Sequence, residues 1–125
     1  RPADRDQVLL DLSLEMATNL ADELERPDEA VVAVRDVIEA RGFGPCFVHR
    51  TGHSIGEECH GNAVNIDNLE TKDERLLVPG ICFSIEPGIY LEGEMAVRTE
   101  IDVFVTPAGE VEVYGPIQKD LLLIG

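Results

Sequence analysis

Apolar residues recur at helical spacing in the first part of the chain. Within residues 6–25 they fall three or four positions apart, with polar residues between them. This spacing predicts an amphipathic helix that buries one face. The residues that form the apolar stripe are Leu10, Leu14, Ala17, Ala21 and Leu24.

A second helix is predicted directly after the first. Pro27 is followed by Asp28 and Glu29, and both features suit a helix start because Pro fits the first turn and acids complement the N-terminal dipole. Val31, Val34 and Ile38 continue the apolar stripe. We expect this helix to stop at Gly42 and the following Gly-Pro pair. Residues 1–42 are therefore predicted to be a helical segment.

Beyond residue 42 the pattern becomes typical of strands and loops. Residues 61–80 are polar with little periodicity, and Val78-Pro79-Gly80 ends them. Four later runs are rich in β-branched and aromatic residues and predict strands: Ile81–Ile85, Ile89–Leu91, Ala96–Val105 and Glu110–Tyr114. Two helices followed by antiparallel strands predict an α+β fold in a single domain, with residues 43–125 forming the strands and loops.

Composition and charge narrow the classes of partner. The 125-residue chain is 44% hydrophobic with a net charge of −15, which disfavours nucleic acid and anionic membranes as partners. It contains no apolar run long enough to span a bilayer. Three cysteines are an odd number without framework spacing, so we expect reduced thiols and a cytoplasmic protein, with one buried disulfide as the alternative.

All three histidines fall within residues 47–60, FVHRTGHSIGEECH. Such a cluster is a candidate metal or substrate site, although a single loop histidine is more often a surface residue that only forms hydrogen bonds. Cys59 beside His60 could be read as a zinc pair. That interpretation is weak because the sequence has no second pair with ligand spacing.

A hairpin folded at Gly93 would place Glu86 opposite Glu100, since paired residues would have numbers that add to 186. Two opposed carboxylates repel unless a cation or a proton lies between them. A bulge at Pro87-Gly88 would shift this register. Together with the histidine cluster, the pair suggests a carboxylate-rich site for Mn²⁺, Co²⁺ or Zn²⁺.

Three motifs in order, FVHRTGHSIG, FSIEPGIY and VRTEIDVFV, resemble the C-terminal half of the pita-bread, creatinase-like M24 metallopeptidases. Within that superfamily the chain looks most like the Xaa-Pro peptidases, aminopeptidase P and prolidase, over residues 43–113. The resemblance implies the C-terminal half of a pita-bread fold, with two helices followed by a curved antiparallel sheet. It also implies metal-dependent hydrolysis of Xaa-Pro bonds by a dinuclear centre with a bridging water.

The resemblance further implies which residues hold metal. His53 matches the histidine ligand, Glu86 a carboxylate ligand that also shuttles a proton, and Glu100 the carboxylate that bridges two ions. We expect these ions to be Mn²⁺, with Co²⁺ or Zn²⁺ as alternatives. The family's other two ligands are aspartates on a hairpin of the first half. We therefore expect the chain to be part of a longer enzyme, or to meet its missing half on another chain or in a homo-oligomer, and to be inactive alone.

By the same resemblance His49 and His60 match the histidines that contact the scissile carbonyl of a proline-containing peptide. Arg98 matches an arginine that supports the carboxylates. Two alternatives stay open: a pseudo-enzyme or inactive fragment that binds peptides or proteins, and a small structural domain without metal. Aminopeptidase and dipeptidase specificity are not distinguished.

Overall fold

The second predicted helix ends where the glycine signal places it. The structure is a computed structural model that describes residues 35–116 and residue 118, and residues 35–40 are helical. Gly42 has a φ of 83°, which glycine adopts at low cost, and its N–H donates to the Glu39 carbonyl at 2.9 Å. The predicted helix over residues 6–25 and the helix start at Pro27 lie outside the described residues. A short 3-10 helix, η1 (Gly44–Cys46), follows.

Among the described residues, six short strands follow η1, and every pairing between them is antiparallel. They are β1 (Ser54–Ile55), β2 (Cys82–Ile85), β3 (Gly88–Leu91), β4 (Met95–Arg98), β5 (Ile101–Val105) and β6 (Val111–Tyr114). A four-stranded sheet has the order β1-β2-β5-β6, and β3 and β4 form a two-stranded sheet. The predicted antiparallel sheet is thus confirmed. The predicted strand Ala96–Val105 is divided into β4 and β5, because residues 99 and 100 leave the ladder.

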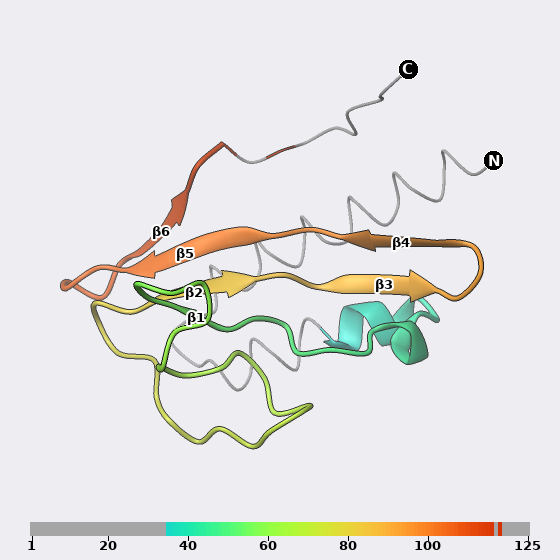
Figure 1. Ribbon diagram of the computed structural model, residues 1–125, viewed down its shortest axis with the longest axis horizontal. Coiled ribbons are helices and arrows are strands. Elements are labelled where there is room, and N and C mark those ends of the chain that lie inside the picture. The colour runs from blue at the N-terminus through green and yellow to red at the C-terminus, as the bar shows by residue number, and fades with distance from the viewer. Residues whose placement is uncertain (1–34, 117, 119–125) are drawn as a thin grey trace.

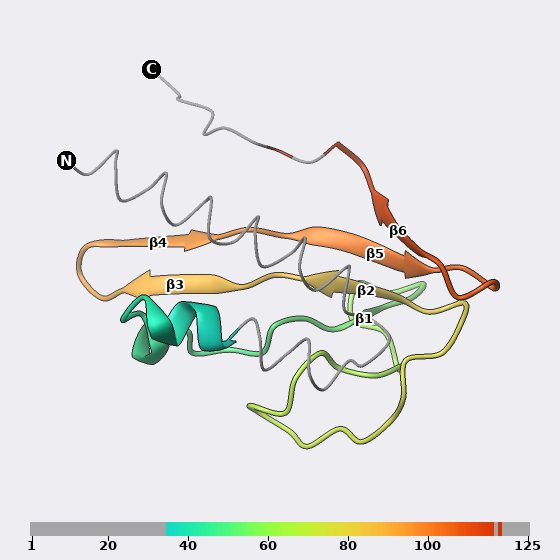
Figure 2. The same cartoon turned by 180° about the vertical axis from the view of Figure 1, so that it is seen from behind.

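The two sheets form one long ribbon in space. In Figures 1 and 2, β2 leads directly into β3 and β4 leads directly into β5, while the end of the helix and η1 lie beside β3. The polar loop of residues 61–80 projects on the β1 side, and β6 lies at the other edge of the four-stranded sheet. Within residues 35–116 and 118, no helical segment combines the length and apolar character that a bilayer crossing requires.

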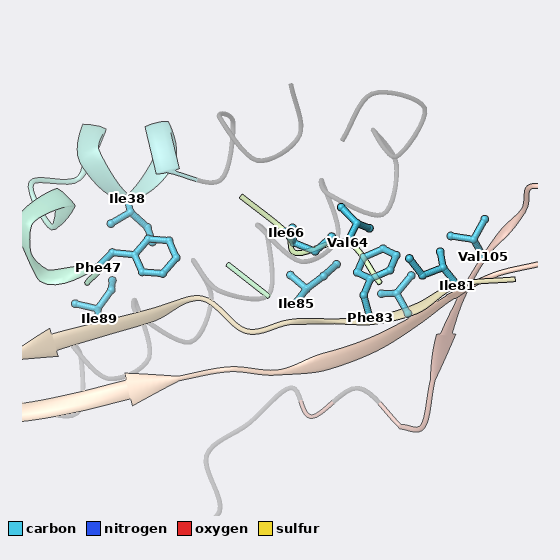
Figure 3. Close-up of a cluster of buried hydrophobic side chains, with 10 residues drawn as sticks. Ile38, Phe47, Val64, Ile66, Ile81, Phe83, Ile85, Ile89 and Val105 are labelled. Atoms are coloured by element: carbon cyan, nitrogen blue, oxygen red, sulfur yellow. The ribbon is translucent and has the colours of Figure 1, made fainter. Parts of the chain in front are cut away.

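One face of the ribbon carries the hydrophobic core. Phe83, Ile85 and Val103 are completely buried, and each such side chain contributes about 1.5–3 kcal/mol relative to an exposed one. Figure 3 shows Ile38, Phe47 and Ile89 packed together beneath the helix, with the other core side chains continuing along β2. Since side chains alternate along a strand, the residues between the core positions point to the opposite face.

The register of the ribbon matches the sequence prediction. Ile85 pairs with Ile101 and Gly88 pairs with Arg98. The numbers of paired residues therefore add to 186 both before and after the break between β2 and β3. Thr99 N–H donates to the Pro87 carbonyl at 3.2 Å in the same register, so Pro87 and Gly88 cause no shift. The turn lies at Gly93, with a φ of 76°.

Candidate functional site

Three neighbouring strand segments bring the predicted site residues together. Ser54 pairs with Phe83, and the pairing continues upstream because Ser84 N–H donates to the His53 carbonyl at 2.8 Å. His53 therefore lies opposite Ser84 and diagonal to Glu86, a separation that long side chains can bridge. Its Nε2 lies 3.0 Å from Glu86 Oε1, and both side chains are 13% exposed.

The motif SIEPGIY places every second residue on the face opposite the core. Ser84, Glu86, Gly88 and Tyr90 alternate with the buried Ile85 and Ile89. Ser84 Oγ donates to Glu86 Oε1 at 2.9 Å and accepts from the His53 N–H at 3.2 Å, which links the two. Sequence reasoning missed Ser84 and Tyr90, although this alternation with the predicted Glu86 could have identified both.

The hydrogen bonding of His53 leaves one nitrogen for a cation. Its Nδ1 lies 3.0 Å from the Ser54 carbonyl, and because a carbonyl only accepts, Nδ1 carries the hydrogen in the neutral ring. Nε2 then presents a lone pair to the Glu86 carboxylate at 3.0 Å. Two acceptors at this distance need a proton or a cation between them, so these residues fit a metal ion.

Arg98 lies between the two opposed glutamates. Its guanidinium is 3.7 Å from Glu86 Oε2 and 3.9 Å from Glu100 Oε2. These separations are ion pairs rather than hydrogen bonds. Arg98 and Glu100 are about half exposed, at 53% and 45%, whereas Glu86 is largely covered. The site thus opens to solvent on its Glu100 side.

His49 and His60 occupy different parts of this face. The His49 Nε2 lies 2.8 Å from the Tyr90 hydroxyl and its Nδ1 lies 2.7 Å from the Arg50 carbonyl. The Tyr90 hydroxyl is therefore the donor to Nε2 in the neutral ring. A Cβ on Gly88 would lie 2.9 Å from His49 Nε2 and 2.8 Å from Tyr90 Cε2, so a larger residue here would require these side chains to shift.

His60 lies against the proposed ligand histidine rather than against His49. The rings of His53 and His60 are 4.3 Å apart between centroids. His60 also lines a hollow of about 260 Å³ together with Gly56, Glu57, Glu58, Gly61 and Asn62. The two predicted substrate histidines therefore approach the centre from separate segments.

Two residues that sequence reasoning missed hold the segment of residues 49–51 in place. Asp67 Oδ2 accepts hydrogen bonds from the Thr51 N–H at 2.7 Å, the Thr51 hydroxyl at 2.8 Å and Arg35 Nη2 at 2.9 Å. Arg35 also donates to the His49 carbonyl at 2.8 Å. No local pattern signals this arrangement, because its members come from a helix and a polar loop.

Known proteins resemble this chain over nearly all of its length. The model of metallopeptidase family M24 matches residues 2–107. An Xaa-Pro dipeptidase of Lactobacillus helveticus is 34% identical over 127 residues, covering 98% of this chain and 33% of that protein. A probable dipeptidase, PepE, of Mycobacterium tuberculosis is 40% identical over 104 residues, covering 80% of this chain and 27% of that protein. The chain thus spans about a third of the length of such curated relatives.

Solved structures show the same fold. A prolidase from Thermococcus sibiricus has a TM-score of 0.82 at 26% identity, covering 97% of this chain and 32% of that one. An Xaa-Pro dipeptidase from Bacillus anthracis has a TM-score of 0.77 at 32% identity, covering 99% of this chain and 34% of that one. The expected pita-bread metallopeptidase resemblance is confirmed.

Proposed function

The chain belongs to metallopeptidase family M24, and from this premise we propose that it contributes His53, Glu86 and Glu100 to a dinuclear metal centre with a bridging water that hydrolyses Xaa-Pro peptide bonds. The observation that carries the proposal is the 3.0 Å approach of His53 Nε2 to Glu86 Oε1. Because the chain spans about a third of its relatives' length, the activity, substrate and partners of the whole protein are part of the proposal.

The ligand set supports a hard or borderline ion. One imidazole and two carboxylates suit Mn²⁺, with Co²⁺ and Zn²⁺ as alternatives. When bound, the ions would supply a nucleophile at neutral pH by lowering the pKa of the attacking water to about 7. Further carboxylates from another part of the polypeptide, or from another chain, would complete the coordination.

The chain's own residues would orient the substrate and move the proton. Glu86, held by the Ser84 hydroxyl at 2.9 Å, would take a proton from the attacking water on a carboxylate oxygen and return it to the leaving amine. Arg98 would limit the repulsion between Glu86 and Glu100, since it contacts both. The two carboxylates could then lie close together before substrate binds.

The two remaining histidines would contact the scissile carbonyl. Hydrogen-bond donors aimed at that oxygen stabilise the charge that develops there in the transition state. His60 is exposed and lines the hollow of about 260 Å³, so a substrate could reach its ring from solvent. For His49 the proposal requires Nε2 to exchange Tyr90 for the substrate oxygen and to carry a hydrogen.

The test compares Glu100→Gln with Glu112→Gln in the polypeptide that carries this chain at the length of its relatives. Glu112 is an exposed strand residue on β6 and serves as the matched control. Hydrolysis of an Xaa-Pro dipeptide and of a longer peptide beginning Xaa-Pro is measured with added Mn²⁺. We expect Glu100→Gln to abolish hydrolysis, because a neutral amide cannot bridge two cations, and Glu112→Gln to leave it unchanged.

Two outcomes would contradict the proposal. Near-normal turnover in Glu100→Gln with metal still bound would remove Glu100 from the centre. A wild-type protein that binds metal and both peptides but cleaves neither would instead be a peptide-binding module. The preferred peptide length distinguishes a dipeptidase from an aminopeptidase.

A further inference from the structure

The Cys59-His60 pair acquires a third metal-ligating neighbour in the folded chain. Candidate ligand atoms of His53, Cys59 and His60 all lie within 4.8 Å of one another. We propose that these three residues form a second, mononuclear site for Zn²⁺ or another thiophilic divalent ion, separate from the carboxylate-rich centre but sharing His53 with it. The regulatory consequence argued below rests on the proposed function, whereas the site itself does not.

A tight loop brings the three residues together. Gly61 N–H donates to the Ser54 carbonyl at 2.7 Å, and Gly56 N–H donates to the Glu58 carbonyl at 3.1 Å. These bonds fold residues 56–61 back over the end of β1, so that the His60 ring lies 4.3 Å from the His53 ring. The spacing of residues in the sequence did not reveal His53 as a third ligand beside Cys59 and His60, because the loop brings them together only in the folded chain.

The chemistry of the three ligands differs from that of the carboxylate-rich centre. Two imidazoles and one thiolate favour Zn²⁺ and Co²⁺ over Mn²⁺, whereas an imidazole with two carboxylates accepts all three ions. Cys59 and His60 are both exposed, so solvent can fill a fourth, tetrahedral position. Cys59 would bind the ion as a thiolate.

Sharing His53 makes the two sites mutually exclusive. The His53 Nδ1 is held by the Ser54 carbonyl at 3.0 Å, which leaves Nε2 as the single nitrogen for an ion. An ion held by Cys59 and His60 would therefore withdraw His53 from Glu86. A thiophilic metal is thus expected to inhibit the peptidase, while Mn²⁺, which binds thiolate poorly, is not.

Cobalt absorption tests the site without reference to activity. Co²⁺ is titrated into the metal-stripped chain, and thiolate-to-cobalt charge-transfer absorption is followed in the near ultraviolet. The proposed carboxylate-rich centre has only nitrogen and oxygen ligands, so it gives no such band. We expect one equivalent of Co²⁺ to produce the band, Zn²⁺ to displace it and Cys59→Ser to remove it.

Cys82→Ser is the matched control. Cys82 is half-buried in β2, and burial, with the nearby Asp102 carboxylate, raises the pKa of its thiol, so its thiolate is disfavoured. We expect this variant to keep the band. Glu100→Gln should also keep the band, and in the polypeptide at the length of its relatives it should lose peptidase activity, which separates failure of this site from failure of the proposed function.

Two results would overturn the second site. One is a wild-type chain that shows no thiolate band. The other is a Cys59→Ser variant whose affinity for Co²⁺ falls by less than about tenfold, since loss of even a residue that only hydrogen-bonds to a metal ligand costs that much.

Inhibition by Zn²⁺ tests the regulatory role. If hydrolysis is observed, Zn²⁺ should inhibit the wild type at least about tenfold more strongly than it inhibits Cys59→Ser. Equal inhibition of the two proteins would exclude this role.

Discussion

Asp67 and Arg35 form an ion pair, 2.9 Å between Oδ2 and Nη2, beneath the segment that carries His49. The same Asp67 oxygen accepts both hydrogen bonds from Thr51, and Arg35 lies 4.3 Å above the Phe47 ring. The Asp67 side chain is 2% exposed. A buried carboxylate with three donors on one oxygen holds the His49 backbone through charge rather than through apolar packing.

Asp67→Asn is expected to lower the free energy of unfolding by about 3 kcal/mol. This value is near the lower end for breaking a buried ion pair, because the Arg35 side chain is still 21% exposed. Asp67 has a φ of 90°, and Asn tolerates this region nearly as well. The variant therefore removes charge without adding backbone strain. Urea denaturation measures the loss.

The exposed pair of Lys72 and Glu74 is the control for Asp67. Its side chains are 74% and 75% exposed, so Lys72→Ala should cost less than about 1 kcal/mol. Equal losses in the two variants would show that the Asp67 pair is no more than a surface contact.

Tyr90→Phe is expected to free the His49 ring. The tyrosine hydroxyl donates to Nε2 at 2.8 Å, and loss of one such bond costs about 1 kcal/mol of stability. Nitrogen-15 NMR of the imidazole should show a single tautomer, with the hydrogen on Nδ1, in the wild type and a changed Nε2 signal in the variant. Tyr114→Phe, at a residue that is 62% exposed, should alter neither quantity. An unchanged His49 signal in Tyr90→Phe would exclude the hydrogen bond.

Gly52→Ala is expected to destabilise the fold strongly, by at least about 3 kcal/mol. A Cβ at residue 52 would lie 1.8 Å from the Ser84 carbonyl oxygen, so the neighbouring segments that carry His53 and Glu86 would have to separate. Gly56→Ala is the matched control, because its nearest neighbour would be Gly61 Cα at 3.7 Å. We expect thermal unfolding to show a large loss for Gly52→Ala and a change within about 1 kcal/mol for Gly56→Ala.

The loop after His60 is expected to weaken in acid because of Asp73. Hydrogen bonds from the Arg75 side chain and then from the Asn65 N–H hold the pKa of Asp73 well below its ordinary value of 3.8. The unfolded chain then binds more protons than the folded one in acid. The stabilisation is therefore present above 3.8 and is lost as the pH falls below that value toward the folded pKa.

Asp73→Asn tests this pH dependence. The difference in free energy of unfolding between the wild type and the variant should be constant from neutral pH to about pH 5 and should shrink at about pH 3. Chemical denaturation at a series of pH values measures it. A difference that persists undiminished at about pH 3 would mean that the Asp73 carboxylate carries no net stabilising charge interaction.

The sequence by itself determined those features that depend on near neighbours. The helix end at Gly42 could be predicted because the positive φ that ends it depends only on the local preference of glycine. The pairing of Glu86 with Glu100 followed from the two-residue period of strands and the turn at Gly93, and the flanking pairs keep that register. The ordered motifs around His53, Glu86 and Glu100 predicted the family for the same reason, since each motif is a short contiguous stretch.

Only the tertiary structure decided the contacts that join distant segments. The divided strand at Thr99, the Asp67–Arg35 pair and the approach of Cys59 to His53 each require a loop to close or two segments to pack. The free energy of such contacts depends on which surfaces meet and on the entropy of bringing them together. Hydrophobic and polar periodicity carries no information on either quantity, because it describes the face of one segment and not the segment that will cover it.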